Sequence, residues 1–341
     1  MAPADLTSIP DLITSTRRAA VSTYVVTGAA GFIGSHLAEA LLRRGDAVIG
    51  IDAFSDYYPR RLKQSNLMYL LDRPNFTFLE ADLLDAPLEA LVAGCHGIFH
   101  LAAQPGVRGS WGSGFEHYVR DNVQATQRVF EVASAAGIRV VYASSSSVYG
   151  DAEGYPTPED TPAMPRSPYG VTKLCCEHLA RAFALNKGLD AIGLRYFTVY
   201  GPRQRPDMAT QRICEALNTG RGFEIYGTGE QSRDVTYVDD AVRATMTVME
   251  VAPGGRAYNV GGGSETSLLE IISTCEEICS STLDVRHKAV ADGDVTRTAA
   301  DTSLILEETG WAPEVGLEEG LTSQLAWTMS RRALTEASAL V

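Results

Sequence analysis

A tyrosine and a lysine four residues apart could form a proton-transfer pair. Tyr169 and Lys173 fall at the start of a stretch with helical periodicity, so both side chains are expected to project from one helix face. A phenol with a pKa of about 10 is a poor base at neutral pH, but a neighbouring ammonium favours the phenolate. The pair is therefore suited to removing a proton from an alcohol, although an ordinary exposed helix face can carry the same spacing.

Three glycines in VVTGAAGFIGSH, namely Gly28, Gly31 and Gly34, follow an apolar run and open a helical pattern. Glycine there lets backbone N–H groups approach a pyrophosphate, and the helix N-terminus attracts its negative charge. Asp52 lies 24 residues beyond Gly28, at the end of the next apolar run. An acid at that place accepts hydrogen bonds from ribose hydroxyls and repels a 2′-phosphate, which predicts NAD rather than NADP.

Short apolar runs alternate with helical patterns through the first half of the chain, and these elements must position the residues above. We expect strands at 24–27, 47–52, 76–80, 97–101 and 140–144, and helices at 32–44, 118–136 and about 168–186. This alternation predicts βαβ units and an α/β fold with a doubly wound, parallel, Rossmann-type sheet. Ligands of such sheets bind beyond the carboxyl ends of the strands.

The second half of the chain is less regular. Residues 151–168 contain five prolines and are predicted to be a loop, and turn-rich segments follow residue 200. We expect an N-terminal extension at 1–20 and an NAD-binding domain at 21–197 plus about 235–262. A smaller mixed α/β cap that binds substrate is expected at 198–234 and 263–330, followed by a tail at 331–341.

The composition disfavours several classes of partner. The 341 residues include 29 basic and 42 acidic side chains and carry a net charge of −13, which disfavours nucleic acid and anionic membrane surfaces. The first 20 residues lack the apolar core of a signal peptide, and no apolar run is long enough to span a membrane, so we expect a cytoplasmic protein. The six cysteines are expected to be reduced, with Cys275 and Cys279 as core thiols and no metal site.

Seven segments resemble the extended short-chain dehydrogenase/reductase family, specifically its NAD-dependent nucleotide-sugar epimerases and dehydratases. They are TGAAGFIGSH, HLAAQPGVR, DNVQAT, YASSSSVYG, SPYGVTK, LRYFTVYGP and SRDVTYVDD, and the resemblance extends over residues 24–327. Besides the three glycines and Asp52, it implies cofactor contacts from Phe32, Ile33, Asp82, Leu83, Leu101, Ala102, Ala103, Asn122, Ser144, Tyr169, Lys173 and Tyr196. It implies catalysis by Ser145, Tyr169 and Lys173, with Ser144 and Ser146 left open as alternatives for the serine.

The residues before VYG distinguish the reactions of this family. Its 4,6-dehydratases and UDP-glucuronate decarboxylases place acids there, whereas this chain has Ser146 and Ser147. The segments DAFSDYYPRRLKQSNL and GPRQRPDMA are similar to those of UDP-glucuronate 4-epimerases. The resemblance therefore implies epimerisation of UDP-glucuronate to UDP-galacturonate through a transient 4-keto sugar, in a homodimer.

The substrate contacts follow from the same resemblance. Arg205 would bind the sugar carboxylate beside Thr198, and Arg233 would bind phosphate. Ala291 and Asp292 stand where the family often has a basic residue, which leaves Arg108 or Arg212 for the diphosphate. The full set of expected substrate contacts is Arg108, Ser145, Ser146, Tyr169, Thr198, Arg205, Arg212, Arg233, Asp294 and Arg297.

Three other functions remain open at this point. A 4-epimerase of UDP-glucose or UDP-N-acetylglucosamine keeps every catalytic residue and differs only in the sugar pocket, where Thr198 and Arg205 oppose it. An NDP-sugar dehydratase or decarboxylase would keep the first oxidation and divert the ketone. A dinucleotide-binding protein without turnover would be expected to lack the Tyr169–Lys173 pair.

Overall fold

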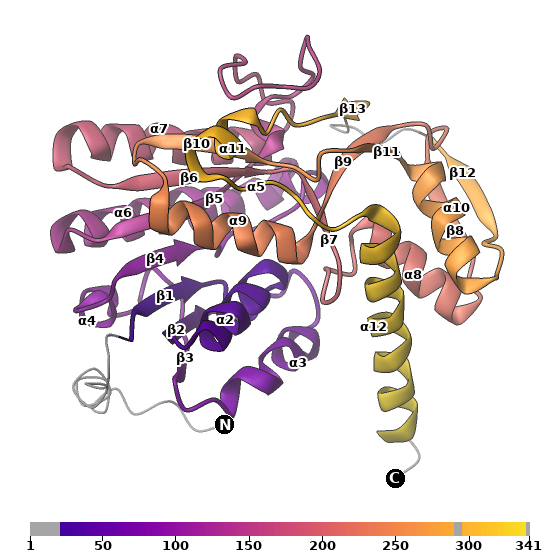
Figure 1. Cartoon of the computed structure of the whole chain (residues 1–341), viewed down its shortest axis with the longest axis horizontal. Coiled ribbons are helices and arrows are strands. Elements are labelled where there is room, and N and C mark those ends of the chain that lie inside the picture. Colours follow the sequence, from indigo (N-terminus) through magenta and orange to yellow (C-terminus); the bar gives the residue numbers. More distant parts are fainter. Residues whose placement is uncertain (1–20, 290–294, 339–341) are drawn as a thin grey trace.

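A computed structural model of the chain describes residues 21–289 and 295–338, with side chains as far as residue 331. Its centre is a sheet of seven parallel strands in the order β10-β6-β5-β4-β1-β2-β3 (Figure 1). The strands are β1 (Thr23–Thr27), β2 (Ala47–Asp52), β3 (Phe76–Glu80), β4 (Gly97–His100), β5 (Arg139–Ser145), β6 (Ala191–Tyr196) and β10 (Arg256–Val260). The predicted doubly wound α/β fold is confirmed.

Helices cover both faces of this sheet. Along a strand, neighbouring residues belong to opposite cores: Val25 and Ile98 pack on one side, Val26 and Phe99 on the other. This two-sided burial explains why the strands read as continuous apolar runs. One face is covered by α2 (Phe32–Arg44), α3 (Arg60–Leu71) and α9 (Val238–Val251), and the other by α4 (Leu88–Val92), α6 (Ala125–Ala136) and α7 (Pro168–Lys187).

A smaller cap of mixed structure lies beside the sheet, to the right in Figure 1. Its strands β7 (Thr198–Tyr200), β11 (Glu265–Ser267) and β13 (Arg297–Thr298) all pair with β9 (Ser232–Tyr237), and β8 (Phe223–Tyr226) pairs with β12 (Val285–Lys288). Its helices are α8 (Ala209–Thr219), α10 (Leu268–Cys279) and α12 (Leu317–Ser338), and α11 (Ser303–Thr309) packs near β10. The cap predicted from the irregular second half is thus present, while the exact domain boundaries stay a prediction.

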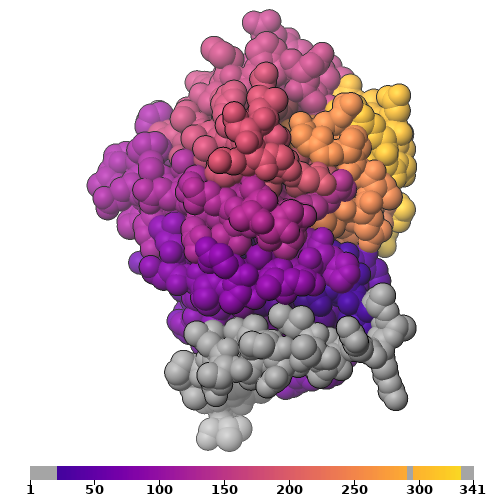
Figure 2. All heavy atoms as spheres, turned by 90° about the vertical axis from the view of Figure 1, so that its left-hand side faces the viewer, coloured from indigo at the N-terminus to yellow at the C-terminus, as the bar shows by residue number. Residues whose placement is uncertain are grey.

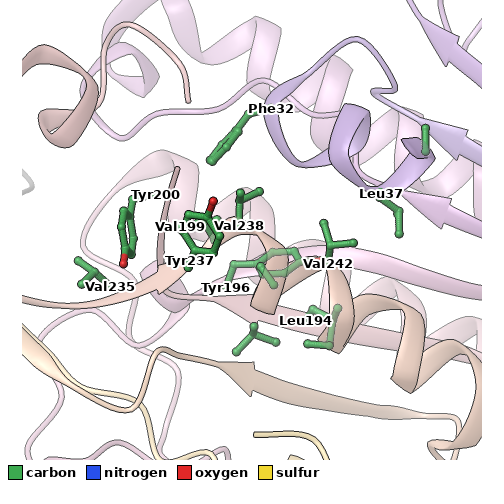
Figure 3. Close-up of a cluster of buried hydrophobic side chains, with 14 of the residues drawn as sticks. Phe32, Leu37, Leu194, Tyr196, Val199, Tyr200, Val235, Tyr237, Val238 and Val242 are labelled. Carbon is green, nitrogen blue, oxygen red and sulfur yellow. The ribbon is translucent and has the colours of Figure 1, made fainter. Parts of the chain in front are cut away.

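One hydrophobic core extends from the sheet into the cap. Figure 3 shows Tyr196 of β6, Tyr200 of β7 and Tyr237 of β9 in one cluster with Val238 and Val242 of α9. The same contiguous cluster includes Ile213 of α8 and Ile271 of α10, which are both buried. The two parts of the molecule are therefore joined by packed side chains, not only by the connecting chain.

The helix expected at 118–136 is divided. It consists of α5 (Phe115–Tyr118), a π-helical segment η4 (Val119–Gln124) and α6. The wider π turn accompanies the inward placement of Asn122, which is buried and bonds the loop after β4 and the helix α7. The sequence pattern could not show this change, because apolar spacing hardly distinguishes one π turn from an α turn.

Two features of the described residues concern metals and membranes. Cys275 is buried and Cys279 is half-buried, as expected of core thiols, and no group of described side chains could hold a metal ion. Within residues 21–289 and 295–338, no helix combines the length and the apolar character needed to cross a membrane.

Two buried histidines make the fold sensitive to acid. Burial lowers the pKa of His100 to about 3, helped by the charge of Lys173, and its ring nitrogens lie 2.8 Å from Thr27 Oγ1 and 3.0 Å from Thr126 Oγ1. Burial, with the charge of Arg203, lowers the pKa of His36 to about 4. The unfolded chain binds protons at these histidines below about pH 6.5 while the folded chain does not, so stability falls as the pH drops through this window.

We expect His100→Gln to lose less stability on acidification than the wild type, because glutamine can bond both threonines but does not titrate. The difference should grow by about 1.4 kcal/mol per pH unit below about pH 6.5. Urea unfolding at about pH 7, 6 and 5 measures it, and parallel pH profiles for the two proteins would show that the fold does not lower the pKa of His100.

Candidate active site

A cavity of about 890 Å³ opens at the carboxyl ends of β1, β2, β4 and β5, between the sheet and the cap. Of the residues predicted for the site that the structure describes, its walls contain all except Asn122 and Arg297. Segments far apart in sequence, from the glycine loop to β9, thus meet in one place. This is the arrangement that a doubly wound sheet produces at the end of its strands.

The glycine loop has no space for a side chain at its glycines, and this close packing lets its backbone approach a phosphate group. Gly28 has a φ of +71°, and a Cβ there would lie 2.8 Å from the backbone nitrogen of Ala102. A Cβ on Gly34 would lie 2.1 Å from the carbonyl oxygen of Gly28, so the first turn of α2 packs directly against the loop. Within the described part of the chain, no side chain caps the N-terminus of α2, which leaves its first N–H groups available to a pyrophosphate.

Asp52 is placed to hold both the loop and a ribose. Its carboxylate oxygens accept hydrogen bonds from the N–H groups of Ala30 (3.0 Å) and Phe54 (2.8 Å). Burial raises the pKa of Asp52, against the opposing effects of these bonds and of Lys63. Each carboxylate oxygen has a second lone pair, so the group can still accept from ribose hydroxyls. The loop and this acid therefore fit a dinucleotide such as NAD.

The start of α7 fixes the tyrosine–lysine pair. Ser167 caps the helix by accepting the N–H of Gly170 at 3.1 Å, and Pro168 occupies the first turn. Lys173 is buried and donates from Nζ to the carbonyl oxygen of Ala143 at 2.8 Å. Its Nζ lies 5.9 Å from the ring centre of Tyr169. The ammonium is thereby held beside the phenol from which a proton would be lost.

Ser144 and Ser145, at the end of β5, differ in the hydrogen bonds that their hydroxyl groups form. Ser144 donates to Oε1 of Glu177 at 2.5 Å, so its proton is already committed to a carboxylate. Ser145 accepts the N–H of Ser147 at 3.1 Å, and its own proton remains available for another acceptor. This difference favours Ser145 over Ser144 as the serine that bonds a substrate hydroxyl.

Arginines line the cap side of the cavity. Arg233 donates to the carbonyl oxygens of Ser232 (2.8 Å) and Val295 (2.6 Å). Arg108 lies over the ring of Tyr226, with its guanidinium carbon 4.3 Å from the ring centre, and Arg212 lies 5.1 Å from the ring centre of Phe223. Three cations thus surround the part of the cavity where a diphosphate would be bound.

Arg205, which also lines the cavity, has an acidic partner that was not predicted from the sequence. Its Nε and Nη2 donate to the two oxygens of Asp207, each at 3.0 Å, and the hydroxyl of Tyr57 donates to the same carboxylate at 3.2 Å. The only signal in the sequence was the position of Asp207 two residues after Arg205 in RPDMA.

Two predicted residues among those that the structure describes, Asn122 and Arg297, do not line the cavity. Asn122 donates to Thr172 Oγ1 at 3.0 Å and accepts the N–H of Gln104 at 2.7 Å, so it supports the site from behind. Arg297 donates from Nε to both oxygens of Glu265, at 2.8 and 2.9 Å. Asp294 lies outside the described residues. Direct ligand contacts by these three stay a prediction.

Comparisons with known proteins agree on one family. The model of the NAD dependent epimerase/dehydratase family matches residues 24–261. A Bacillus subtilis (strain 168) protein named as an uncharacterized UDP-glucose epimerase, YtcB, is 42% identical over 309 residues, which cover 90% of this chain and 98% of that protein.

Two solved proteins resemble the whole described fold. The UDP-glucuronic acid 4-epimerase of Bacillus cereus, in complex with UDP-glucuronic acid and NAD, is 39% identical with a TM-score of 0.88, over 91% of this chain and 99% of that one. MoeE5 in complex with UDP-glucuronic acid and NAD is 42% identical with a TM-score of 0.82, over 92% and 100%. MoeE5 has also been solved with UDP-glucose and NAD.

We expect Gly34→Ala to weaken NAD binding about 30-fold, because the new methyl group would displace the loop and break two hydrogen bonds to the pyrophosphate, each of about 1 kcal/mol. Calorimetric titration with NAD measures the loss. Gly45→Ala is the matched control, since Gly45 ends the same helix in a left-handed conformation (φ +102°) with nothing within 4 Å of a new Cβ. The control should unfold more readily but bind NAD normally, and equal affinities in all three proteins would contradict the assignment.

Proposed function

The chain belongs to the NAD dependent epimerase/dehydratase family, and from this we propose that it is a UDP-glucuronate 4-epimerase, which interconverts UDP-glucuronate and UDP-galacturonate. NAD is the cofactor of the family, and the glycine loop and Asp52 fit it. The observation that carries the substrate assignment is that Arg205 lines the same cavity as Ser145, Tyr169 and Lys173, which places a cation within reach of the same bound sugar.

The proposed mechanism uses three side chains of the chain. The phenolate of Tyr169 accepts the proton of the sugar 4-hydroxyl, the ammonium of Lys173 stabilises the phenolate charge, and Ser145 orients the hydroxyl through a hydrogen bond. NAD+, held by the glycine loop and Asp52, would supply the acceptor for the C4 hydride and, once reduced, its donor to the opposite face of the 4-keto sugar, so the reaction would have no net redox change. Between the two transfers the sugar turns over about its diphosphate link, while the diphosphate stays bound to the arginines on the cap side.

The strand that carries the serines favours epimerisation over elimination. The two residues before Val148 are Ser146 and Ser147, so no acid from this strand is available to move protons at C5 or C6. Arg205 provides the second constraint. A 4-keto uronate is a β-keto acid, and it loses carbon dioxide when its C5–C6 bond aligns with the carbonyl π system. A guanidinium that binds the carboxylate can hold that bond out of alignment.

The direct test of this function is incubation of the protein with UDP-glucuronate, with the two epimers resolved by NMR. We expect a mixture of UDP-glucuronate and UDP-galacturonate with no change in mass. Conversion of UDP-glucose without any conversion of UDP-glucuronate would replace the proposal by the neutral-hexose alternative. A product lighter by carbon dioxide or water would favour a decarboxylase or a dehydratase.

We expect Arg205→Ala to lower kcat/KM for UDP-glucuronate roughly 30- to 150-fold, the loss of one charge-assisted contact of about 2–3 kcal/mol, and to release some UDP-pentose. Mass spectrometry of the products measures the leak. Arg203→Ala is the matched control, because Arg203 pairs with Glu39 at 2.7 Å and is not among the cavity-lining residues. Unchanged kinetics in Arg205→Ala would refute the carboxylate contact.

We also propose a cytoplasmic homodimer that pairs through α6 and α7. Val171 and Leu185 lie on one face of α7 and are 48% and 75% exposed, so this face offers apolar side chains to a second copy of the chain. The magenta part of the chain, which includes α6 and α7, forms a broad part of the surface in Figure 2.

We expect the double variant Val171→Glu/Leu185→Glu to run as a monomer in light scattering, because carboxylates would be desolvated in a dimer contact. The matched control is Leu306→Glu, since Leu306 is 50% exposed on α11, away from these helices. A dimer that persists in the double variant would place the contact elsewhere.

A further inference from the structure

The pocket cation Arg205 is already neutralised within the chain. Both carboxylate oxygens of Asp207 accept hydrogen bonds from Arg205, one from Nε and one from Nη2, each at 3.0 Å. Although burial by itself raises the pKa of Asp207, the bonded and charged Arg205 outweighs burial and holds that pKa below its usual range. Burial, together with the charge of Asp207, raises the pKa of Tyr57 to about 12, so Tyr57 keeps its proton and donates it to Asp207.

This pairing leaves one side of the guanidinium for a ligand. A bidentate bond through Nε and Nη2 uses two of the five N–H groups, and the Nη1 end can still donate to a second acceptor. Arg205 and Asp207 both line the cavity, and their side chains are only 21% and 38% exposed. The local charge that a sugar would meet is therefore close to zero, not +1.

We propose that Asp207 is a specificity-determining residue, an internal counter-ion of Arg205 that allows the cavity to accept both a uronate and a neutral hexose. The inference rests on the proposed function, and adds to the positive charge of Arg205 the negative charge of its neighbour Asp207. A uronate places a second carboxylate on Arg205, and the repulsion from Asp207 weakens its binding. A neutral hexose gives Arg205 no anion, and without Asp207 the guanidinium would be left desolvated and unpaired.

The test is the relative preference of Asp207→Asn for two nucleotide sugars. With the wild type as reference, kcat/KM and the dissociation constant are measured for UDP-glucuronate and for UDP-glucose on the NAD-loaded protein. We expect the preference for UDP-glucuronate to rise about tenfold, with weaker binding of UDP-glucose as part of the change. Asp207→Glu restores the charge and should return the preference toward that of the wild type.

A purely structural role for Asp207 would change the substrate preference in the opposite direction. If Asp207 only held Arg205 in position, Asp207→Asn would lose activity on UDP-glucuronate, keep activity on UDP-glucose, and lower the preference. A lower or unchanged preference overturns the proposal. Asp56→Asn is the matched control, because Asp56 is exposed, does not line the cavity and carries the same charge on the segment that contains Tyr57. It should leave the preference within about twofold of the wild type.

The two proposals fail in different ways. If the wild type turns over neither sugar, the proposed function is wrong. The ratio of dissociation constants still decides whether Asp207 sets the preference, since it needs no turnover.

Discussion

The catalytic end of the sheet is held together by the buried ion pair of Glu177 and Arg195. Arg195 of β6 donates to both oxygens of Glu177 on α7, at 3.0 and 2.8 Å, and Glu177 also accepts from Ser144 at the end of β5. Arg195 further donates to Tyr149, whose hydroxyl donates to Asn259 of β10. Loss of one partner from such a pair costs about 3–5 kcal/mol, because it strands the other charge away from water. Through this network the helix of Tyr169 and the strand of Ser145 keep a fixed distance.

The first half of the fold was predictable because its signals are local. The helix 32–44 and the strands 47–52 and 76–80 have the predicted bounds, since each is an apolar period that ends in glycine, aspartate or a turn. The strands β6 and β10 were not predicted as separate elements. Their place in the sheet depends on parallel pairing with a strand far away in sequence, which no local pattern encodes.

The residues of the site, too, could be predicted only in part. Residues that belong to a motif of fixed spacing, such as Gly28 and Tyr169, could be found from the sequence, and both line the cavity. Residues that act on other side chains could not, because their role depends on which partners the fold brings near. Asp207 acts through the hydrogen bond that it accepts from Arg205. Asn122 supports the site through its hydrogen bond to Thr172, from its place in the π-helical segment η4.

The single core shared by sheet and cap has a consequence for how the enzyme works. Tyr196, Tyr200 and Tyr237 pack across the boundary, so the cap cannot swing away as a hinged lid without opening a large apolar surface to water (Figure 3). The motion that turnover requires then belongs to the sugar ring, which has to rotate inside a chamber whose walls stay in place. One set of walls therefore has to accommodate both epimers of the sugar.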